Sequence, residues 1–342
     1  MNVKTAVSLM RGGRLLVLLR LKVLFTCFYR LCFLASMADT ALLEKLSRGR
    51  ATVEGLAGAS AKDPSVCNAL KAWLELGIHL GLVRQDASGY SLRGFLAKRL
   101  AAPGSDPIRA LVREVAGLHH HYIVQTPGRL EQGLTWDPSH PHGGYGDIIA
   151  RSSRTLEPFL VEVIDRFFPP SGRVRLLEVG CGHAAHIAYA ARRNDGLTAV
   201  GLELDPSVAE GARSTVRAMG LKDRVEIEVE DVRTYRSEGV FDVLTLYNNI
   251  YYFPVQERIE LLRHLRDLLG PNGRILLTTG CAGGSIEFEL VNLIHASTRG
   301  WGRLPGKDEL LQQMTVAGFE RACAMELIPG NKYYAFVGHC SG

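Results

Sequence analysis

The sequence predicts an α/β protein: a doubly wound, mostly parallel sheet with a closing antiparallel hairpin, preceded by a mainly α-helical, winged-helix-like domain. Apolar strand-like segments alternate with helical patterns between residues 174 and 279, which is typical of a parallel sheet. Two further apolar segments flank the turn Pro329-Gly330-Asn331. Three helical patterns and a short hairpin occupy residues 38–102. The length of 342 residues fits about two domains.

The composition is that of an ordinary globular protein. Apolar residues make up 46% of the chain and charged residues 22%, which excludes a disordered, collagen-like or purely coiled-coil chain. The seven cysteines form no C-x-x-C pair, so we expect neither a disulfide framework nor a structural zinc site. A reducing, cytoplasmic location is the resulting expectation.

The net charge is concentrated at the N-terminus. Residues 1–36 hold six cations and no acid, and removing this +6 from the total of +5 leaves −1 for the rest of the chain. A nearly neutral body gives no electrostatic attraction to nucleic acid, so we expect no nucleic-acid partner.

Residues 1–37 are predicted to form an N-terminal packing helix. Arg20, Lys22 and Arg30 interrupt the apolar run, and its longest uncharged stretch is the seven residues Val23–Tyr29. This is too short for a membrane span of about 20 residues. The cations fall on several sides of the helix, which weakens a membrane-surface role. Packing against another domain or a partner subunit is favoured, while membrane association and a cleaved signal remain alternatives.

Residues 38–102 resemble a winged-helix module. Helices are expected at Ala38–Ser47, after the capping residue Thr52, and from Pro64 to Leu80, followed by the hairpin 82–92. A DNA-reading third helix normally carries several cationic or amide side chains. Here the only cation is Lys71, offset by Glu75, so we predict a dimerisation module instead.

Residues 103–150 are predicted to be a helical connector with a pocket-lining loop. The helix ends in His119-His120-His121, and the loop 138–145 is rich in Pro, Gly and His. Adjacent histidines on a helix diverge, and no carboxylate stands at ligand spacing. No metal site is therefore expected, and the segment suits substrate-facing residues.

Residues 151–342 are predicted to carry the chemistry. Strands are expected at 174–179, 198–203, 225–231, 241–247, 274–279, 322–328 and 332–337, with helices at 184–193, 206–219 and 255–269. In such a sheet, ligands bind at the carboxyl ends of the strands.

Three strand ends carry groups suited to a nucleoside. Gly180 and Gly182 permit a tight turn and close approach of a ligand to the backbone. Glu203 ends the next strand, where a carboxylate can accept both ribose hydroxyls, and Asp231 ends the third. The spacing Gly180-x-Gly182-x-x-Ala185 also fits a dinucleotide site, but Glu178 would repel a diphosphate.

These residues resemble the class I S-adenosylmethionine-dependent methyltransferases over about residues 152–338. The resemblance rests on Glu178-Val-Gly180-Cys-Gly182, Glu203, Asp231 and the run Phe241–Asn248, while Ala184 replaces the family's third glycine. It implies a Rossmann-like fold and S-adenosylmethionine as cofactor. The module at 38–102 resembles the dimerisation domain of small-molecule O-methyltransferases, which implies a homodimer.

The resemblance assigns a role to each strand end. Gly180 and Gly182 would line the methionine moiety, Glu203 would bind the ribose, and Asp231 with Val232 the adenine. The plain alternative for Asp231 is a turn cap. Further candidate cofactor-binding residues are Tyr145, Arg151, Ser152, Glu178, Leu204 and Asn248, with Arg151 facing the cofactor's carboxylate.

No single base stands out for catalysis. The catalytic candidates are Asn248, Asn249, Tyr251, His183 and His295, with His119, His120 and His121 as further possible bases. Asn248-Asn249 occupies the region of the plant-type catalytic histidine, and a polar turn is the plain reading of that pair. The segment Glu287–Arg299, with Glu289, Asn292 and Arg299, is a candidate substrate lid.

The predicted function is methyl transfer to a small organic molecule in secondary metabolism, with oxygen favoured over carbon or nitrogen as acceptor. Catalysis of this transfer consists mainly of alignment and exclusion of water. Two alternatives stay open: a fold relative that binds the cofactor but catalyses a rearrangement or cyclisation, and a cofactor-sensing winged-helix regulator.

Overall fold

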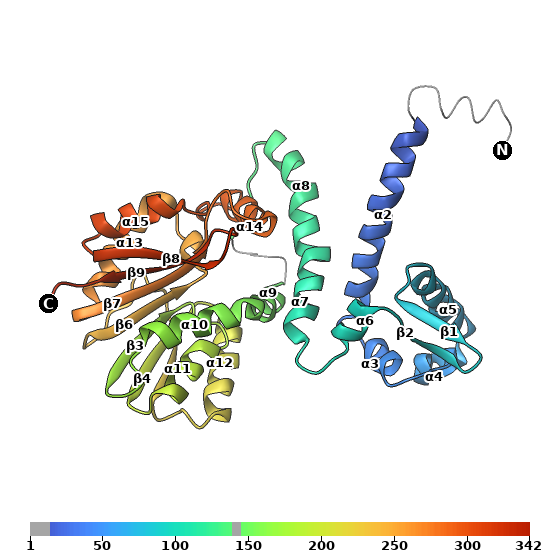
Figure 1. The fold of residues 1–342 in the computed structure, drawn as a ribbon, viewed down its shortest axis with the longest axis horizontal. Coiled ribbons are helices and arrows are strands. Elements are labelled where there is room, and N and C mark those ends of the chain that lie inside the picture. The colour runs from blue at the N-terminus through green and yellow to red at the C-terminus, as the bar shows by residue number, and fades with distance from the viewer. Residues whose placement is uncertain (1–13, 139–144) are drawn as a thin grey trace. The chain divides into compact units, whose positions relative to one another are not determined.

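The computed structural model describes residues 14–138 and 145–342 (Figure 1). The predictions for residues 1–13 and for loop residues 139–144, including His140 and His142, lie outside the described residues. The chain divides into two compact units. The first comprises Met1–His120 with Arg151–Ser153, and the second comprises His121–Ala150 with Arg154–Gly342. The predicted connector 103–150 is thus divided between the two units.

The first unit is helical apart from one hairpin. Its elements are α2 (Arg14–Met37), α3 (Ala41–Ser47), α4 (Val53–Ala57), η2 (Gly58–Lys62), α5 (Pro64–His79), β1 (Val83–Asp86), β2 (Gly89–Leu92), α6 (Phe95–Leu100), α7 (Asp106–Glu114) and the π-helical turn η3 (Val115–His119). The Thr52 side chain caps α4 by accepting from the Gly55 amide at 3.1 Å, as predicted. Lys71 on α5 is exposed.

The buried side chains that helix α2 contributes to the core of the first unit come from its last turns. Phe33, Leu34 and Met37 are buried, and the Phe33 ring stacks on Trp73 of α5 with 4.3 Å between ring centroids. The preceding part of α2 exposes apolar side chains, which is unusual for a helix so rich in leucine.

The second unit contains the predicted sheet. Its elements are α8 (His120–Glu131), α9 (Gly146–Ser152), η5 (Ser153–Leu156), α10 (Glu157–Phe167), β3 (Val174–Val179), α11 (Ala185–Arg193), β4 (Leu197–Glu203), α12 (Pro206–Ala218), β5 (Val225–Val229), β6 (Phe241–Tyr247), η6 (Ile250–Tyr252), η7 (Val255–Glu257), α13 (Arg258–Asp267), β7 (Leu269–Gly280), α14 (Ile286–Ala296), α15 (Lys307–Val316), β8 (Glu320–Ile328) and β9 (Tyr333–His339).

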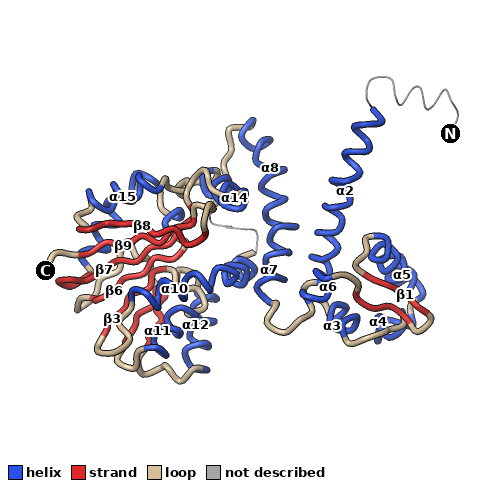
Figure 2. The backbone as a smooth tube through the Cα atoms, viewed as in Figure 1, coloured by secondary structure: helices blue, strands red, loops and turns tan. Residues whose placement is uncertain are grey.

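The sheet has the strand order β5-β4-β3-β6-β7-β9-β8, and Figure 2 labels the strands from β3 to β8 of this order. Strands β5 to β7 pair in parallel, whereas β9 is antiparallel to both β7 and β8. This confirms the doubly wound sheet with a closing hairpin. The strand order reverses between β3 and β6, and ligands bind at such a switch point in open α/β sheets.

Two predicted boundaries differ from the structure. Strand β5 ends at Val229, so Glu230 and Asp231 lie in the loop that follows it. The helix predicted to extend to residue 269 ends at Asp267, and β7 begins at Leu269 rather than at residue 274, so Gly270 and Pro271 lie inside β7. There Phe241 pairs with Leu269 and Val243 with Arg274, so the extra residues of β7 form an irregularity against β6. A local glycine and proline signal cannot distinguish such a bulge from a turn.

Candidate functional site

The turn after β3 lies at the switch point of the sheet and contains three residues in the left-handed backbone conformation. Gly180, Gly182 and Ala184 have φ values of 64°, 54° and 57°. A Cβ atom at Gly180 would lie 2.6 Å from Nδ2 of Asn249, whereas one at Gly182 would meet no atom within 4 Å. The backbone at Gly182 is therefore open to a ligand. Ala184 adopts the glycine-like conformation at a cost in backbone strain.

Glu203 is held in place by the backbone of this turn. Its Oε2 accepts from the Gly182 amide at 3.0 Å and its Oε1 from the Asp205 amide at 3.1 Å. The next residue, Leu204, is 65% exposed although it is apolar. The fixed carboxylate can accept hydrogen bonds from the hydroxyl groups of a ligand. The exposed apolar side chain beside it can pack against a ring of the same ligand.

Asp231 lies beyond β5 and is bound by Arg233. The Arg233 guanidinium contacts both carboxylate oxygens, with 2.6 Å from Nη2 to Oδ2, and its amide donates to Oδ1 at 3.0 Å. This hydrogen bonding lowers the pKa of Asp231. Asp231 therefore acts as a turn cap that binds the amide and the side chain of Arg233. An adenine amino group would have to displace the Arg233 side chain in order to donate to Asp231. Val232 is buried.

The two asparagines after β6 are both tied to the neighbouring strands. Asn248 has a φ of 53°, and its amide donates to the Thr278 carbonyl at 2.8 Å. Nδ2 of Asn249 donates to the Val179 carbonyl at 2.5 Å. Asn249 thus stabilises the strand end under Gly180, while the polar turn at Asn248 faces Tyr333.

Glu178 is a buried carboxylate with few partners. It is 2% exposed, and its Oε2 accepts from the Thr245 hydroxyl at 3.2 Å. Nδ1 of His186, on the first turn of α11, lies 3.7 Å from Oε1. A buried carboxylate is stable only with compensating donors or a cation, so this site favours a cationic group.

Tyr251 and His295, both catalytic candidates, lie together in an aromatic cluster. Their ring centroids are 4.3 Å apart, and the His295 ring also contacts Tyr252 at 4.9 Å and stacks on Trp301 at 5.0 Å. Nδ1 of His295 lies 2.8 Å from the Val291 carbonyl. A carbonyl only accepts, so Nδ1 carries the proton and Nε2 is the basic nitrogen of the neutral ring.

His183 lies elsewhere. Its ring packs on α12, where a Cβ atom at Gly211 would come within 2.7 Å of it. The described contacts of His183 therefore tie it to α12 rather than to the aromatic cluster.

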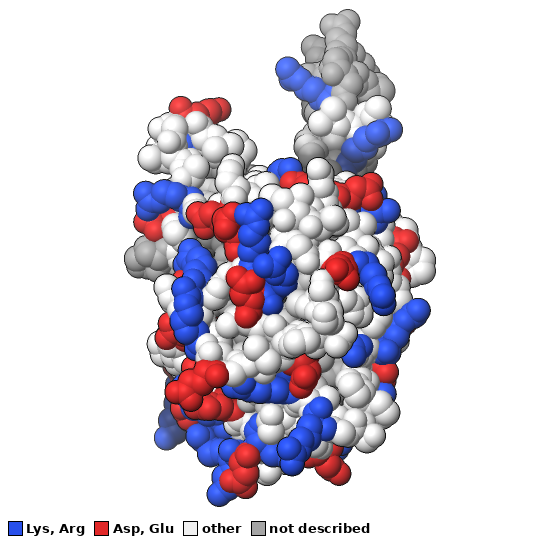
Figure 3. All heavy atoms as spheres, turned by 90° about the vertical axis from the view of Figure 1, so that its left-hand side faces the viewer, with Lys and Arg blue, Asp and Glu red and all other residues white. Residues whose placement is uncertain are grey.

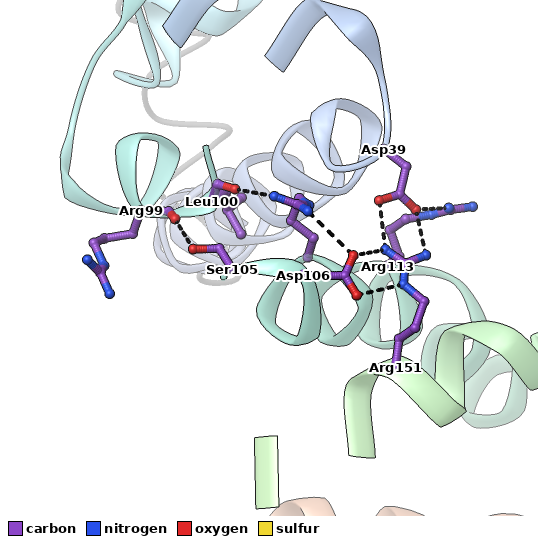
Figure 4. Close-up of polar contacts among 8 residues, drawn as sticks. Asp39, Arg99, Leu100, Ser105, Asp106, Arg113 and Arg151 are labelled. Atoms are coloured by element: carbon purple, nitrogen blue, oxygen red, sulfur yellow. Dashed lines mark hydrogen bonds and ion pairs between the residues drawn. The ribbon is translucent and has the colours of Figure 1, made fainter. Parts of the chain in front are cut away.

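Arg151 and Ser152 belong to the first unit, and Figure 4 shows the acidic partners of Arg151. Arg151 forms ion pairs with Asp39 at 3.1 Å and with Asp106 at 2.6 Å. The Arg151 guanidinium donates hydrogen bonds to Asp106 and Asp39, and these bonds raise the pKa of Arg151 above its ordinary value. The Ser152 hydroxyl donates to Glu114, which also contacts His119 at 3.1 Å. No local sequence pattern indicates Asp39 and Asp106 as partners of Arg151, because they lie 112 and 45 residues away from it.

Tyr145 and the predicted substrate lid both contact neighbouring segments of the second unit. The Tyr145 carbonyl accepts from the Ile149 amide at 2.9 Å and so begins α9. On α14, Asn292 Oδ1 accepts from the Leu304 amide at 2.9 Å. Arg299 pairs with Asp137 at 3.3 Å. The lid segment is thus bound to its flanking loops. Trp301, which completes the aromatic cluster, was missed because it stands just beyond that segment.

The residues that the structure describes can be examined for metal ligands and for the distribution of charge on one face. Among the described residues no three His, Cys, Asp or Glu side chains converge as metal ligands. Acidic and basic side chains are interspersed on the face shown in Figure 3. None of the helices in the described ranges is long and apolar enough to cross a membrane.

Comparison with known sequences identifies the domain. Residues 177–275 match a family described as a methyltransferase domain. The methyltransferase GfsG of Streptomyces halstedii is 27% identical over 142 residues, which is 41% of this chain and 49% of the relative. The 27-O-demethylrifamycin SV methyltransferase of Amycolatopsis mediterranei is 25% identical over 201 residues, 56% of this chain and 70% of that protein. The chain thus spans about half the length of the first relative.

Solved structures share the fold over nearly the whole chain. The mitomycin 7-O-methyltransferase MmcR superposes with a TM-score of 0.76 at 18% identity, covering 96% of this chain and 99% of that one. Human N-acetylserotonin methyltransferase in complex with SAM gives 0.73 at 12% identity, covering 97% and 98%. These likenesses confirm the predicted fold class, and the family match confirms the predicted methyltransferase domain.

Proposed function

Because the chain carries a class I methyltransferase domain, we propose that it binds S-adenosylmethionine and transfers its methyl group to a small organic molecule. The observation that carries this proposal is the Glu203 carboxylate, fixed by the Gly182 amide at 3.0 Å beside an open glycine backbone. S-adenosylmethionine supplies a methyl group activated by a sulfonium. The chain's residues bind, orient and exclude water.

The adenosine end of the cofactor fits the second and third strand ends. Glu203 has lone pairs left for two ribose hydroxyls, and the exposed Leu204 offers an apolar surface for the adenine ring. Asp231 would accept from the adenine amino group once Arg233 moves. The Asp231–Arg233 pair is largely solvent-exposed on the arginine side, and such pairs are weak.

The methionine end fits the first and fourth strand ends. Gly182 leaves room for the ligand, and the buried Glu178 carboxylate lacks the cation that its burial calls for. An α-ammonium group supplies that charge. Asn248, held at the same edge by Thr278, is available to orient the amino acid portion.

The acceptor is proposed to lie against the aromatic cluster of Tyr251, Tyr252, His295 and Trp301. Nε2 of His295 is the group we assign as general base, because Nδ1 is committed to the Val291 carbonyl. A hydroxyl acceptor must lose a proton on methylation, and the unprotonated Nε2 of a neutral imidazole can accept it.

An oxygen acceptor in secondary metabolism is favoured by the relatives. Two of the similar proteins are named as O-methyltransferases, of demethylrifamycin and of mitomycin. One shorter match, 28% identical over 125 residues, is an L-tyrosine C(3)-methyltransferase from Streptomyces lavendulae, so carbon is the second choice.

A homodimer formed through α2 is the proposed assembly. Ten large apolar side chains between Leu15 and Tyr29 are 36–64% exposed. Apolar and basic residues surround this helix on all sides, which is the pattern of a helix enclosed by protein rather than one lying on a membrane. A cytoplasmic location is proposed because all seven cysteines are free thiols.

Transfer of a labelled methyl group tests the proposed activity. The purified protein is incubated with methyl-labelled S-adenosylmethionine and a panel of phenols and polyketide alcohols. We expect label in at least one acceptor, and less in the His295→Gln variant, with a loss of about 10² in kcat for removal of a general base. His264→Gln, a substitution on α13, is the control. Label in an acceptor at undiminished kcat in His295→Gln would remove His295 from the mechanism.

A further inference from the structure

The phenol hydroxyl of Tyr247 is a buried polar group that stabilises the fold through no described hydrogen bond. Tyr247 is the last residue of β6 and is 7% exposed. Its hydroxyl is buried and has no hydrogen-bond partner among the described residues. A buried hydroxyl without a hydrogen-bond partner destabilises the folded chain, so such a group indicates a position where a ligand supplies the missing contact.

The strand register directs Tyr247 toward Glu178. Glu178 of β3 pairs with Thr245 of β6, and residues two apart on a strand share a face. Glu178, Thr245 and Tyr247 therefore lie on one face of the sheet, the face covered by α11. Glu178 is near enough to act on Tyr247, since burial and then the Glu178 charge raise the pKa of the phenol well above its ordinary value.

His186 of α11 joins these two side chains. Its ring meets the Tyr247 ring edge-on at 5.4 Å, and its Nδ1 lies 3.7 Å from Glu178 Oε1. Glu178 stands two residues before Gly180, so this group of three side chains includes the residue that leads into the glycine turn. The site thus combines a carboxylate with too few donors and a hydroxyl with no partner.

A primary ammonium group matches both deficits. It carries one positive charge, which the Glu178 carboxylate needs, and three N–H donors, of which the Tyr247 oxygen can accept one. Because its pKa is raised, the phenol stays protonated across physiological pH and binds the ammonium as a neutral oxygen acceptor.

We propose that Tyr247 is a cofactor-binding residue whose hydroxyl, together with Glu178, holds the α-ammonium of S-adenosylmethionine. This inference rests on the cofactor assigned above. It adds a contact that the glycine turn and the strand-end acids do not supply. It also explains why a tyrosine, rather than an apolar residue, ends a strand whose other side chains on this face include buried Val243.

The test compares ligands with and without the amino acid portion. S-adenosylhomocysteine has the ammonium, whereas 5′-methylthioadenosine has the same nucleoside and thioether but no amino acid. We expect Tyr247→Phe to weaken S-adenosylhomocysteine binding about tenfold to a hundredfold, as for a lost hydrogen bond to a charged group. Binding of 5′-methylthioadenosine should stay unchanged. Both affinities are measured by titration calorimetry.

Two controls separate this role from a general loss of structure. Tyr189→Phe removes a phenol of α11 that already bonds Asp165 at 3.0 Å, and it should leave both affinities unchanged. The melting temperature of ligand-free Tyr247→Phe should equal or exceed that of the unaltered protein, because the variant loses an unpaired buried hydroxyl.

Each outcome decides between the two proposals. Equal loss of both ligands in Tyr247→Phe, or loss of neither, overturns the role of Tyr247 while leaving the cofactor assignment intact. Failure of the unaltered, folded protein to bind any of the nucleosides overturns the cofactor assignment itself, and the role of Tyr247 with it.

Discussion

The carboxyl edge of the sheet and helix α2 both hold side chains in unfavourable surroundings, but the side chains are of opposite kinds. At the sheet edge, Glu178 and Tyr247 are polar groups buried with too few partners. Along α2, side chains such as Leu24 and Phe28 are apolar groups left 64% and 40% exposed. Burial of an unpaired polar group and exposure of apolar surface both raise the free energy. The first deficit is relieved by a small cationic ligand, the second by a protein surface.

The largest expected effect comes from placing charge on α2. Leu24→Glu should dissociate the proposed dimer, because a carboxylate cannot be buried in an apolar interface without a cation. Light scattering after size exclusion should give about half the mass of the unaltered protein at micromolar concentration. Leu96→Glu, on α6 at 58% exposure, is the matched control and should keep the dimer mass. A monomer from the unaltered protein would contradict the α2 interface.

Next in size is the effect of Glu203 on the ligand. Glu203→Ala should weaken cofactor binding by about 1–3 kcal/mol through loss of charged hydrogen bonds. Glu210→Ala, which removes a carboxylate of α12 that pairs with Arg217 at 2.8 Å, should leave the affinity unchanged. Unchanged affinity in Glu203→Ala would separate this acid from the ligand site.

The two glycines of the turn should respond unequally to alanine. Gly180→Ala places a methyl group 2.6 Å from Asn249 Nδ2 and also strains the backbone, whereas Gly182→Ala meets open space and pays only the strain of about 1–2 kcal/mol. Urea unfolding should therefore rank the free energies of unfolding as unaltered protein, Gly182→Ala, Gly180→Ala, from highest to lowest. The reverse order of the two variants would disagree with the geometry of the turn.

The smallest expected effect is on how the stability of the first unit depends on acidic pH. Hydrogen bonds from Arg151 and Arg113 lower the pKa of Asp39 despite its partial burial, and a hydrogen bond from Arg151 lowers that of Asp106. Their contribution to stability is present above the unfolded pKa of about 3.9 and is lost as the pH falls through the lower folded values.

Arg151→Met tests this acid dependence. Between pH 5 and pH 2 its melting temperature should fall less steeply than that of the unaltered protein. The difference is small, about 1 kcal/mol or less, because these carboxylates are about one third exposed. Parallel curves for the two proteins would exclude the ion pairs as its source.

Features local in sequence were predictable, and features made by distant contacts were not. The strand β3, its glycine turn and Glu203 follow from a short apolar run and the spacing of single residues. The ion pairs of Arg151 could not be predicted, because Asp39 and Asp106 lie in distant segments of the chain and no local pattern indicates them. The same holds for Trp301 beside His295, and for Tyr247, whose significance depends on its lack of a partner.

The most direct test of the central claim is calorimetric titration of the purified protein with S-adenosylmethionine and, separately, with S-adenosylhomocysteine. The fixed Glu203 carboxylate, the open backbone at Gly182 and the underpaired Glu178 predict micromolar binding of both ligands to one site per chain. Folded protein that binds neither ligand would contradict the account and return the dinucleotide alternative to consideration.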